Sequence, residues 1–355
     1  MIEVEHLSKI YGSTAAIQDV DFSVASGEIL GFLGPNGAGK TTTMRILAGY
    51  IPATTGTARV AGFDVHEKSL EVRKRIGYLP ENPPLYLDMT VEGFLTFVAS
   101  IKGVAAGDRR SRVSSAIERC QLTEKRKVLI RKLSKGYKQR VGIAQAIVHD
   151  PPVIILDEPT VGLDPKQIIE VRNLIKGLAQ QHTIILSTHI LPEVSMTCDR
   201  VTIINRGKII ATNTPDNLLS ELTGNMGYLL EIGGNIEQVE SLLQPISGLS
   251  QIDIQTIESP LNPTRYSVKI KTASTQELGK DIAQVLIHNG LELYEMRRTR
   301  PTLEDVFLNL ITTEENTLHQ TAVTELLPPA ETELASLSAE NLLETTSEEN
   351  SPHHE

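Results

Sequence analysis

The sequence predicts an α/β protein with a mostly parallel central sheet, followed by a smaller α+β domain and an acidic tail. Strand-like and helix-like segments alternate over residues 1–220, which is the order of a sheet covered by helices. The short apolar runs VIIL (153–156) and TIIL (183–186) are typical of strands buried on both faces of a parallel sheet. Residues 311–355 have no aromatic residue and many Glu, Ser and Thr residues, which indicates disorder.

The first predicted domain opens with two strands. Residues 1–12 and 15–24 predict strands of a small N-terminal antiparallel sheet. Residues 28–34 (EILGFLG) predict a core strand that leads into a glycine-rich loop and a helix. Between about residues 84 and 150 the pattern turns helical, so we expect a mostly helical insertion in the α/β domain.

The second predicted domain covers residues 226–310. Its segments follow the order strand, helix, strand, strand, helix, strand, which is that of a ferredoxin-like domain. It carries no cluster of catalytic residue types, so we expect an accessory or regulatory role. The segment RPTLEDVFLNL closes it as a predicted amphipathic helix, with Leu303, Val306, Phe307 and Leu310 on one face.

Charge is unevenly distributed along the chain. The net charge is −10, and residues 311–355 hold ten of the 44 acidic residues but no lysine or arginine. The remaining acidic residues therefore balance the 34 lysines and arginines. Because nucleic-acid binding usually needs a basic surplus, we expect no nucleic-acid partner.

Cysteine usage and apolar segments indicate an intracellular location. Only two cysteines occur, Cys120 and Cys198, without the C-x-x-C spacing of a zinc or redox site, so a reducing cytosol fits. No apolar run approaches the roughly 20 residues that span a bilayer. The N-terminus lacks a basic region followed by an apolar stretch, so we expect no secretory signal.

The stretch GPNGAGKTT follows the strand predicted at 28–34. Its spacing, G-x-x-x-x-G-K-T, fits a P-loop, in which backbone N–H groups and a helix N-terminus hold the phosphates of a nucleotide. We expect a catalytic contact of Lys40 with the β/γ-phosphates and a contact of the Thr41 hydroxyl with Mg²⁺. The predicted nucleotide-binding residues here are Gly34, Pro35, Asn36, Gly37, Ala38, Gly39, Lys40, Thr41 and Thr42.

A second motif supplies carboxylates at the end of another strand. In PPVIILDEPT four apolar residues precede Asp157, which is the Walker B pattern, so we expect Asp157 to complete the metal site. The adjacent Glu158 is the predicted catalytic base that orients and activates the attacking water. The alternative interpretation of LDEP is an ordinary helix-capping turn without a catalytic role. The P-loop upstream argues against this alternative.

The segment KLSKGYKQRVGIAQAIVHDP lies directly before this strand, and with it the chain resembles the nucleotide-binding subunit of an ATP-binding cassette (ABC) transporter. LSKGYKQR stands where that family has its signature motif, commonly L-S-G-G-Q. Ser134 and Gly136 are retained, whereas Lys135 and Tyr137 depart from the commonest form. The resemblance implies that Ser134 and Gly136 contact the γ-phosphate of ATP held on the P-loop of another subunit.

The remaining family motifs follow in order. GLDP matches the D-loop and implies that Asp164 lies at a subunit interface. STHI implies that His189 is the catalytic switch histidine, which contacts the γ-phosphate. SKIYG implies that Tyr11 stacks on adenine. Glu81 in GYLPE replaces the glutamine usual in the family, so it either binds the metal or signals between subunits.

Three segments narrow the resemblance to bacterial exporter ATPases of the drug-resistance and gliding-motility type, whose membrane subunits are separate chains. These segments are GYLPE, LSKGYKQR and RPTLEDVFL. The resemblance implies ATP hydrolysis with Mg²⁺, a homodimer or pseudo-dimer formed through ATP, and a separate transmembrane permease. It places the chain peripherally on the cytoplasmic face of the cell (inner) membrane. We expect the apolar stretch PPLYLDMTVEGFLTF to be exposed and to dock the permease. The alternative is that this stretch is buried in the hydrophobic core.

Two other classes of protein share some of these motifs. A soluble ABC ATPase of translation or DNA maintenance is the main alternative, although each motif occurs once here and no long coiled coil interrupts the domain. A small-molecule kinase would share the P-loop but would have no use for a signature motif.

Overall fold

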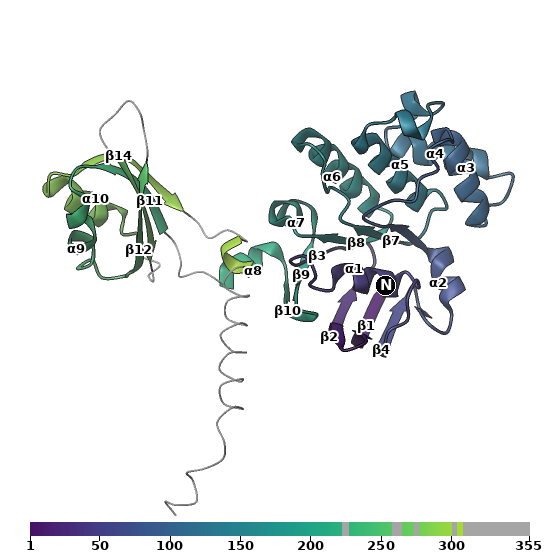
Figure 1. The fold of residues 1–355 in the computed structure, drawn as a ribbon, viewed down its shortest axis with the longest axis horizontal. Coiled ribbons are helices and arrows are strands. Elements are labelled where there is room, and N and C mark those ends of the chain that lie inside the picture. Colours follow the sequence, from purple (N-terminus) through teal and green to yellow (C-terminus); the bar gives the residue numbers. More distant parts are fainter. Residues whose placement is uncertain (222–226, 258–264, 273–276, 300–303, 308–355) are drawn as a thin grey trace, which may run out of the picture. The chain divides into compact units, whose positions relative to one another are not determined.

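The computed structural model describes residues 1–221, 227–257, 265–272, 277–299 and 304–307. Residues 1–221 contain two sheets and the helices between and around them (Figure 1). The predicted acidic tail at 311–355 lies outside the described residues. No helix of the described ranges combines the length and the apolarity needed to cross a bilayer.

The first sheet is antiparallel, with the strand order β2-β1-β4-β5. Alternate residues of β1 and β2 are buried, so one face of this sheet lies against the core. The alternation breaks where the β1–β2 register shifts between Val4 and Leu7. The strands are β1 (Ile2–Tyr11), β2 (Thr14–Val24), β4 (Thr55–Val60) and β5 (Phe63–Asp64).

The second sheet has the order β10-β9-β3-β8-β7-β6 and is parallel except for the antiparallel pair β9–β10. Every residue of β3, β7 and β8 is buried, as expected for central strands covered on both faces. The carboxyl ends of these strands therefore meet at one edge, where such sheets bind ligands. The strands are β3 (Ile29–Leu33), β6 (Ile76–Leu79), β7 (Val153–Asp157), β8 (Thr183–Thr188), β9 (Arg200–Asn205) and β10 (Lys208–Asn213).

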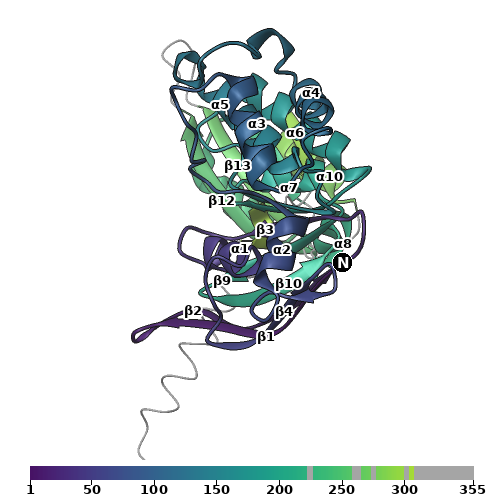
Figure 2. The ribbon, with the colours of Figure 1, turned by 90° about the vertical axis from the view of Figure 1, so that its right-hand side faces the viewer.

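Helices cover both faces of this sheet. α1 lies between the two sheets, and α3 to α6 gather on the opposite face of the parallel sheet (Figures 1 and 2). The helices are α1 (Lys40–Leu47), α2 (Ser69–Arg75), α3 (Val91–Ile101), α4 (Arg109–Arg119), α5 (Lys135–Ile147), α6 (Pro165–Ala179), α7 (Leu191–Thr197) and α8 (Pro215–Glu221), with 3₁₀ turns η1 (Thr123–Lys125) and η2 (Ile130–Lys132).

The main hydrophobic core joins the two sheets around α1. Phe32 of β3 and Met44 of α1 are completely buried in it, and the rings of Phe22 and Phe32 lie 5.3 Å apart. This packing fixes both α1 and the end of β3, which are the two supports of the glycine-rich loop.

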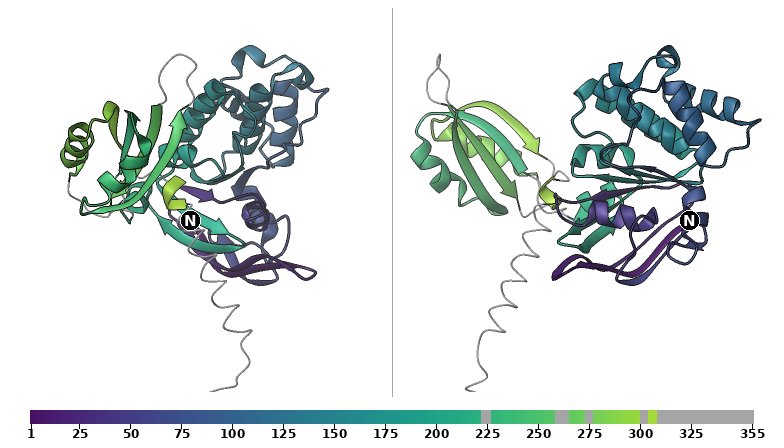
Figure 3. Two further views of the ribbon diagram at one scale, coloured as in Figure 1. Left: turned by 60° about the vertical axis from the view of Figure 1, so that its left-hand side comes forward. Right: turned by 45° about the vertical axis from the view of Figure 1, so that its right-hand side comes forward.

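A separate four-stranded antiparallel sheet forms from residues 227–299, with the order β12-β13-β11-β14. α9 and α10 lie on the same face of this sheet (Figures 1 and 3), where Leu230, Ile270 and Ile282 are completely buried. The ferredoxin-like class and the accessory role of this region stay predictions. The elements are β11 (Gly227–Gly233), η3 (Ile236–Gln238), α9 (Val239–Leu243), β12 (Leu249–Ile257), β13 (Arg265–Thr272), α10 (Gly279–His288) and β14 (Glu292–Thr299).

The helix predicted at 300–310 lies only partly within the described residues. Residues 304–307 are helical and Val306 is 2% exposed, whereas Leu303 and Leu310 lie outside the described ranges.

Candidate active site

The glycine-rich loop joins the end of β3 to the first turn of α1, as the motif predicts. Gly37 and Gly39 have positive φ angles of 81° and 107°, which favour glycine. A Cβ atom on Gly34 would lie 2.3 Å from the backbone oxygen of Ile204, so that position has no room for a side chain. The loop is therefore held in a shape that presents backbone N–H groups at the N-terminus of α1.

Lys40 is buried, with 6% of its surface exposed, and its ammonium group points back along the loop. Lys40 Nζ donates to the backbone oxygens of Gly34 and Pro35 at 2.8 and 3.2 Å. It also lies 3.3 Å from Glu158 Oε1. The positive charge is thus fixed between the phosphate loop and the carboxylate after β7.

Asp157, the last residue of β7, is completely buried beside Thr41. Its Oδ1 accepts hydrogen bonds from Thr41 Oγ1 at 3.3 Å and from the Ser187 hydroxyl, while its Oδ2 has no hydrogen-bond partner among the residues that the structure describes. Burial raises the pKa of the Asp157 carboxyl, and the nearby Glu158 and Glu81 charges raise it further. A buried acceptor without a partner, next to a hydroxyl and other carboxylates, suits a hard divalent cation.

Glu158 is 6% exposed and stands at the turn after β7 with a positive φ of 49°. Such a backbone conformation is uncommon for a residue with a side chain and is often found at functional sites. The turn is held because the Glu158 N–H lies 3.1 Å from the backbone oxygen of Ser187 and 3.2 Å from its hydroxyl. Glu158 Oε2 lies 2.9 Å from Nδ1 of His189, the residue that follows β8.

Lys40, Glu158 and His189 line one cavity of about 400 Å³, a volume in the range of small-molecule sites, whereas the buried Asp157 is not among its lining residues. Glu81 also lines it, so the residue that departs from the family pattern faces the same space as the P-loop. The lining consists of residues 36–42 together with Ala16, Glu81, Glu158, Val161 and His189.

Ser134 and Gly136 do not line this cavity. They line a second cavity of about 290 Å³ together with Tyr137, Arg140 and Gln167. Ser134 occupies the N-cap position of α5, a place where a serine side chain often caps the helix, but its side chain makes no capping hydrogen bond within the described residues. Its hydroxyl is therefore not committed to the helix N-terminus at which it stands.

Two further predicted residues lie at exposed positions. Asp164 is the N-cap of α6, and its Oδ1 accepts from the Gln167 N–H at 2.9 Å, which orders the loop after Glu158. Tyr11 at the end of β1 is 49% exposed, and the Lys9 ammonium group lies 5.1 Å from its ring centre. Neither lines the P-loop cavity, so both roles stay predictions.

Comparison with known proteins identifies the family. A family model described as "ABC transporter" matches residues 17–161. The chain is 30% identical over 311 residues to the linearmycin resistance ATP-binding protein LnrL of Bacillus subtilis (strain 168), a match that covers 87% of the chain and 98% of that relative. This chain is an ATP-binding protein of the ABC transporter family.

Further comparisons agree with this assignment. The bacitracin transport ATP-binding protein BcrA of Bacillus licheniformis is 34% identical over 314 residues, or 88% of this chain and 97% of that protein. A solved structure described as an ATP-binding subunit of an ABC transporter is 31% identical and has a TM-score of 0.57, covering 63% of this chain and 93% of that one. The ABC ATPase fold, the family and the transporter-type ATPase class are thus confirmed, and the soluble ABC ATPase is not favoured.

Three polar residues beside the site were given no role by the motifs: Ser187, Thr160 and Glu193. Ser187 and Thr160 are completely or almost completely buried, at 0% and 3% exposure, and Glu193 is 4% exposed. No motif marks Glu193 in the sequence of helix α7, so its role could be identified only from its contacts in the structure. For Thr160 and Ser187 the available signal was their place within the motif stretches PPVIILDEPT and STHI.

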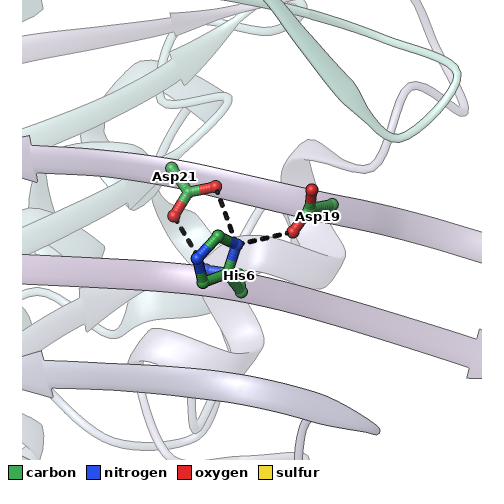
Figure 4. Close-up of side chains that lie close together, drawn as sticks. All are labelled: His6, Asp19 and Asp21. Atoms are coloured by element: carbon green, nitrogen blue, oxygen red, sulfur yellow. Dashed lines mark hydrogen bonds and ion pairs between the residues drawn. The ribbon is translucent and has the colours of Figure 1, made fainter.

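A second polar cluster lies on strands β1 and β2 of the first antiparallel sheet, where His6, Asp19 and Asp21 face one another (Figure 4). The His6 N–H donates to Asp21 Oδ1 and its ring Nδ1 lies 2.8 Å from Asp19 Oδ1. All three are exposed, and the hydrogen bond to Asp19 raises the pKa of His6, with both carboxylate charges adding to the shift. These groups satisfy one another as a surface ion-pair cluster.

Proposed function

We propose that this chain is the peripheral ATPase subunit of an exporter on the cytoplasmic face of the cell membrane. The single observation that carries the hydrolytic mechanism is the convergence of Lys40, Glu158 and His189 on the P-loop cavity, while the adjacent Asp157 accepts a hydrogen bond from Thr41 of the loop. Each comes from a different segment, and the parallel sheet brings the segments to one edge.

The proposed Mg²⁺ ligands are Thr41, Asp157 and Glu81. The hydroxyl of Thr41 and the unpartnered Oδ2 of Asp157 are oxygen ligands of the kind this ion prefers. When bound, Mg²⁺ would neutralise charge on the phosphates. The alternative role of Glu81, signalling between subunits, stays open because it lines both the P-loop cavity and a neighbouring groove.

Hydrolysis of ATP requires a water molecule to attack the γ-phosphorus while the bond to the β,γ-bridging oxygen breaks. We assign the proton of that water to the Glu158 carboxylate, because a buried carboxylate beside the phosphate loop is placed to accept it. Lys40 stabilises negative charge on the phosphates, and His189 orients Glu158 through the 2.9 Å contact.

Dimerisation through ATP explains the position of the signature segment. Ser134 and Gly136 line a cavity that shares no lining residue with the P-loop cavity. The uncapped Ser134 at the N-terminus of α5 is suited to an anion brought by another molecule. We propose that this anion is the γ-phosphate of ATP bound to a second copy, which also places Asp164 at the interface.

The permease is proposed to dock near residues 83–97, but less of this stretch is available than the sequence predicted. Val91, Phe94 and Leu95 are buried because the inner face of α3 packs into the domain, which corrects the expectation of a wholly exposed stretch. Tyr86 and Leu87 remain 53% and 48% exposed. Leu87 also lines a groove of about 390 Å³ that contains Pro83, Pro84 and Leu85.

The transported molecule is proposed only as a class. The two relatives above are described by linearmycin resistance and bacitracin transport, so an antibiotic is the proposed cargo. Recognition of that cargo would reside in the permease, since no part of the P-loop site is specific for it.

The decisive experiment compares phosphate release by the wild-type chain, Glu158→Gln and the exposed control Glu118→Gln. Loss of the base should lower turnover by about 100-fold or more, while ATP binding and the control variant stay near wild type. In cells that make the full chain, fractionation should place it with membranes. Turnover of Glu158→Gln within a few-fold of wild type would refute the hydrolytic mechanism, and recovery only in the soluble fraction would refute the transporter assembly.

A further inference from the structure

Glu193, in the first turn of α7, is a buried carboxyl group that none of the family motifs includes. Its Oε2 accepts hydrogen bonds from the hydroxyls of Thr160 at 2.7 Å and Thr188 at 3.1 Å. Its Oε1 is buried and has no hydrogen-bond partner among the described residues. Burying a carboxyl group with so few donors costs free energy, so a buried glutamate at this position calls for a functional reason.

The two threonines belong to the two segments that carry the hydrolytic groups. Thr160 stands two residues after Glu158, and the same turn is closed by a hydrogen bond from the Val161 N–H to the Glu158 backbone oxygen at 3.3 Å. Thr188 directly precedes His189, and its hydroxyl also accepts from the Ile190 N–H at 3.0 Å. The Thr188 hydroxyl therefore fixes the loop on both sides of His189.

α7 gives Glu193 a rigid base. A Cβ atom on Gly31 of β3 would lie 2.8 Å from Val194 Cγ1, which shows how closely the helix approaches the central sheet. Val194 itself is completely buried. A carboxyl group on such a support can hold two loops with little freedom.

From these contacts we infer that Glu193 is a positioning residue for ATP hydrolysis, tying Thr160 to Thr188 so that Glu158 and His189 stay aligned. The inference rests on the proposed function of Glu158 and His189. Burial raises the pKa of the Glu193 carboxyl and the Glu158 charge adds to the shift, whereas the hydrogen bonds from Thr160 and Thr188 oppose it because they favour the carboxylate. Displacing a reacting group by about 1 Å can cost on the order of 100-fold in rate.

Two substitutions at position 193 separate alignment from general stability. In Glu193→Gln the amide oxygen can still accept from both hydroxyls, so turnover should stay within about threefold of wild type. Glu193→Ala leaves the hydroxyls without that acceptor and should lower turnover by about 10- to 100-fold, with the ATP dissociation constant changed by less than about twofold. Thr197→Val is the matched control, since Thr197 is a buried residue of the same helix whose hydroxyl has no partner among the described residues.

Thr160→Val provides a second variant if Glu193→Ala does not fold. It nearly preserves side-chain volume and removes one of the two hydroxyls that Glu193 binds, so turnover should fall at least severalfold without loss of ATP binding. A double variant adds a readout that a purely structural role would not move. Because Glu193 acts through the aligned pair, adding Glu193→Ala to His189→Ala should change the residual turnover by less than about threefold.

The outcomes distinguish this inference from the proposed function. If Glu158→Gln retains turnover, the proposed hydrolytic mechanism fails and the inference with it. If Glu158→Gln loses turnover while Thr160→Val and any folded Glu193→Ala keep it, only the inference fails. It also fails if Glu193→Ala lowers ATP affinity, melting temperature and turnover together, or if its effect multiplies fully with that of His189→Ala.

Discussion

His149, which follows α5, makes the stability of the ABC domain dependent on pH. The ring Nε2 lies 3.2 Å from the backbone oxygen of Ile76, while Nδ1 is buried and has no partner among the described residues. Lys102 Nζ donates to the same Ile76 oxygen at 3.2 Å. The pKa of His149 is lowered to about 4, mainly by burial and to a smaller extent by repulsion from the Lys102 charge.

The size of the effect follows from linkage. The unfolded chain protonates His149 near its ordinary pKa of about 6.5, whereas the folded chain resists protonation until about pH 4, so between these values the unfolded state binds more protons. Stability is therefore fully present above the unfolded pKa and falls as pH drops toward 4. Between pH 7.5 and pH 5 this one group should lower the free energy of unfolding by about 2 kcal/mol.

Urea unfolding at several pH values measures this contribution. The chain has no tryptophan, so far-ultraviolet circular dichroism is the suitable signal. His149→Gln keeps an amide donor for Ile76 but cannot be protonated, so the stability loss between pH 7.5 and pH 5 should be about 2 kcal/mol smaller than in wild type. A variant whose stability falls with pH as steeply as that of wild type, within about 0.5 kcal/mol, would refute the assignment.

Three further substitutions test separate parts of the structure. If Glu81 binds the metal, Glu81→Gln should raise the Mg²⁺ concentration needed for half-maximal ATPase activity; an unchanged Mg²⁺ dependence would leave it only a signalling role. Gly77→Ala would place a Cβ atom 2.1 Å from the Ala146 backbone oxygen and should destabilise the domain by more than about 2 kcal/mol in urea unfolding. The control Gly177→Ala, which meets no atom within 4 Å, should not destabilise it. Tyr11→Ala should raise the KM for ATP by about tenfold and Tyr11→Phe should not, because stacking on adenine needs only the ring; equal KM values for all three would argue against stacking.

The ABC domain was largely predictable from sequence because its motifs fix both chemistry and topology. The P-loop spacing forces a strand, a glycine-rich turn and a helix, and the structure has β3, Gly37 and Gly39 at positive φ, and α1 in that order. Apolar runs without polar residues, such as 153–156, match strands buried on both faces.

The supporting contacts could not be predicted, because they join residues distant in sequence through side-chain orientation. Thr160 and Glu193 meet only after α6 and β8 have returned the chain to the same sheet edge. The docking stretch was predicted to be more exposed than it is, since a helix such as α3 exposes one side while Phe94 and Leu95 on the other are buried. The exposed position of Tyr11 likewise depends on where β1 ends, which its motif does not specify.

The central claim, that each ATP is hydrolysed between the P-loop of one copy and the signature segment of another, is tested most directly by mixing two inactive chains. Lys40→Ala disables only the P-loop, and Ser134→Arg disables only the signature segment, so each homodimer should be inactive. In a heterodimer of the two, one site combines the intact P-loop of one chain with the intact Ser134 of the other. An equimolar mixture should therefore recover about a quarter of wild-type phosphate release, because half of the dimers are mixed and each has one working site. A mixture that releases no more phosphate than the two variants measured separately would contradict the shared site.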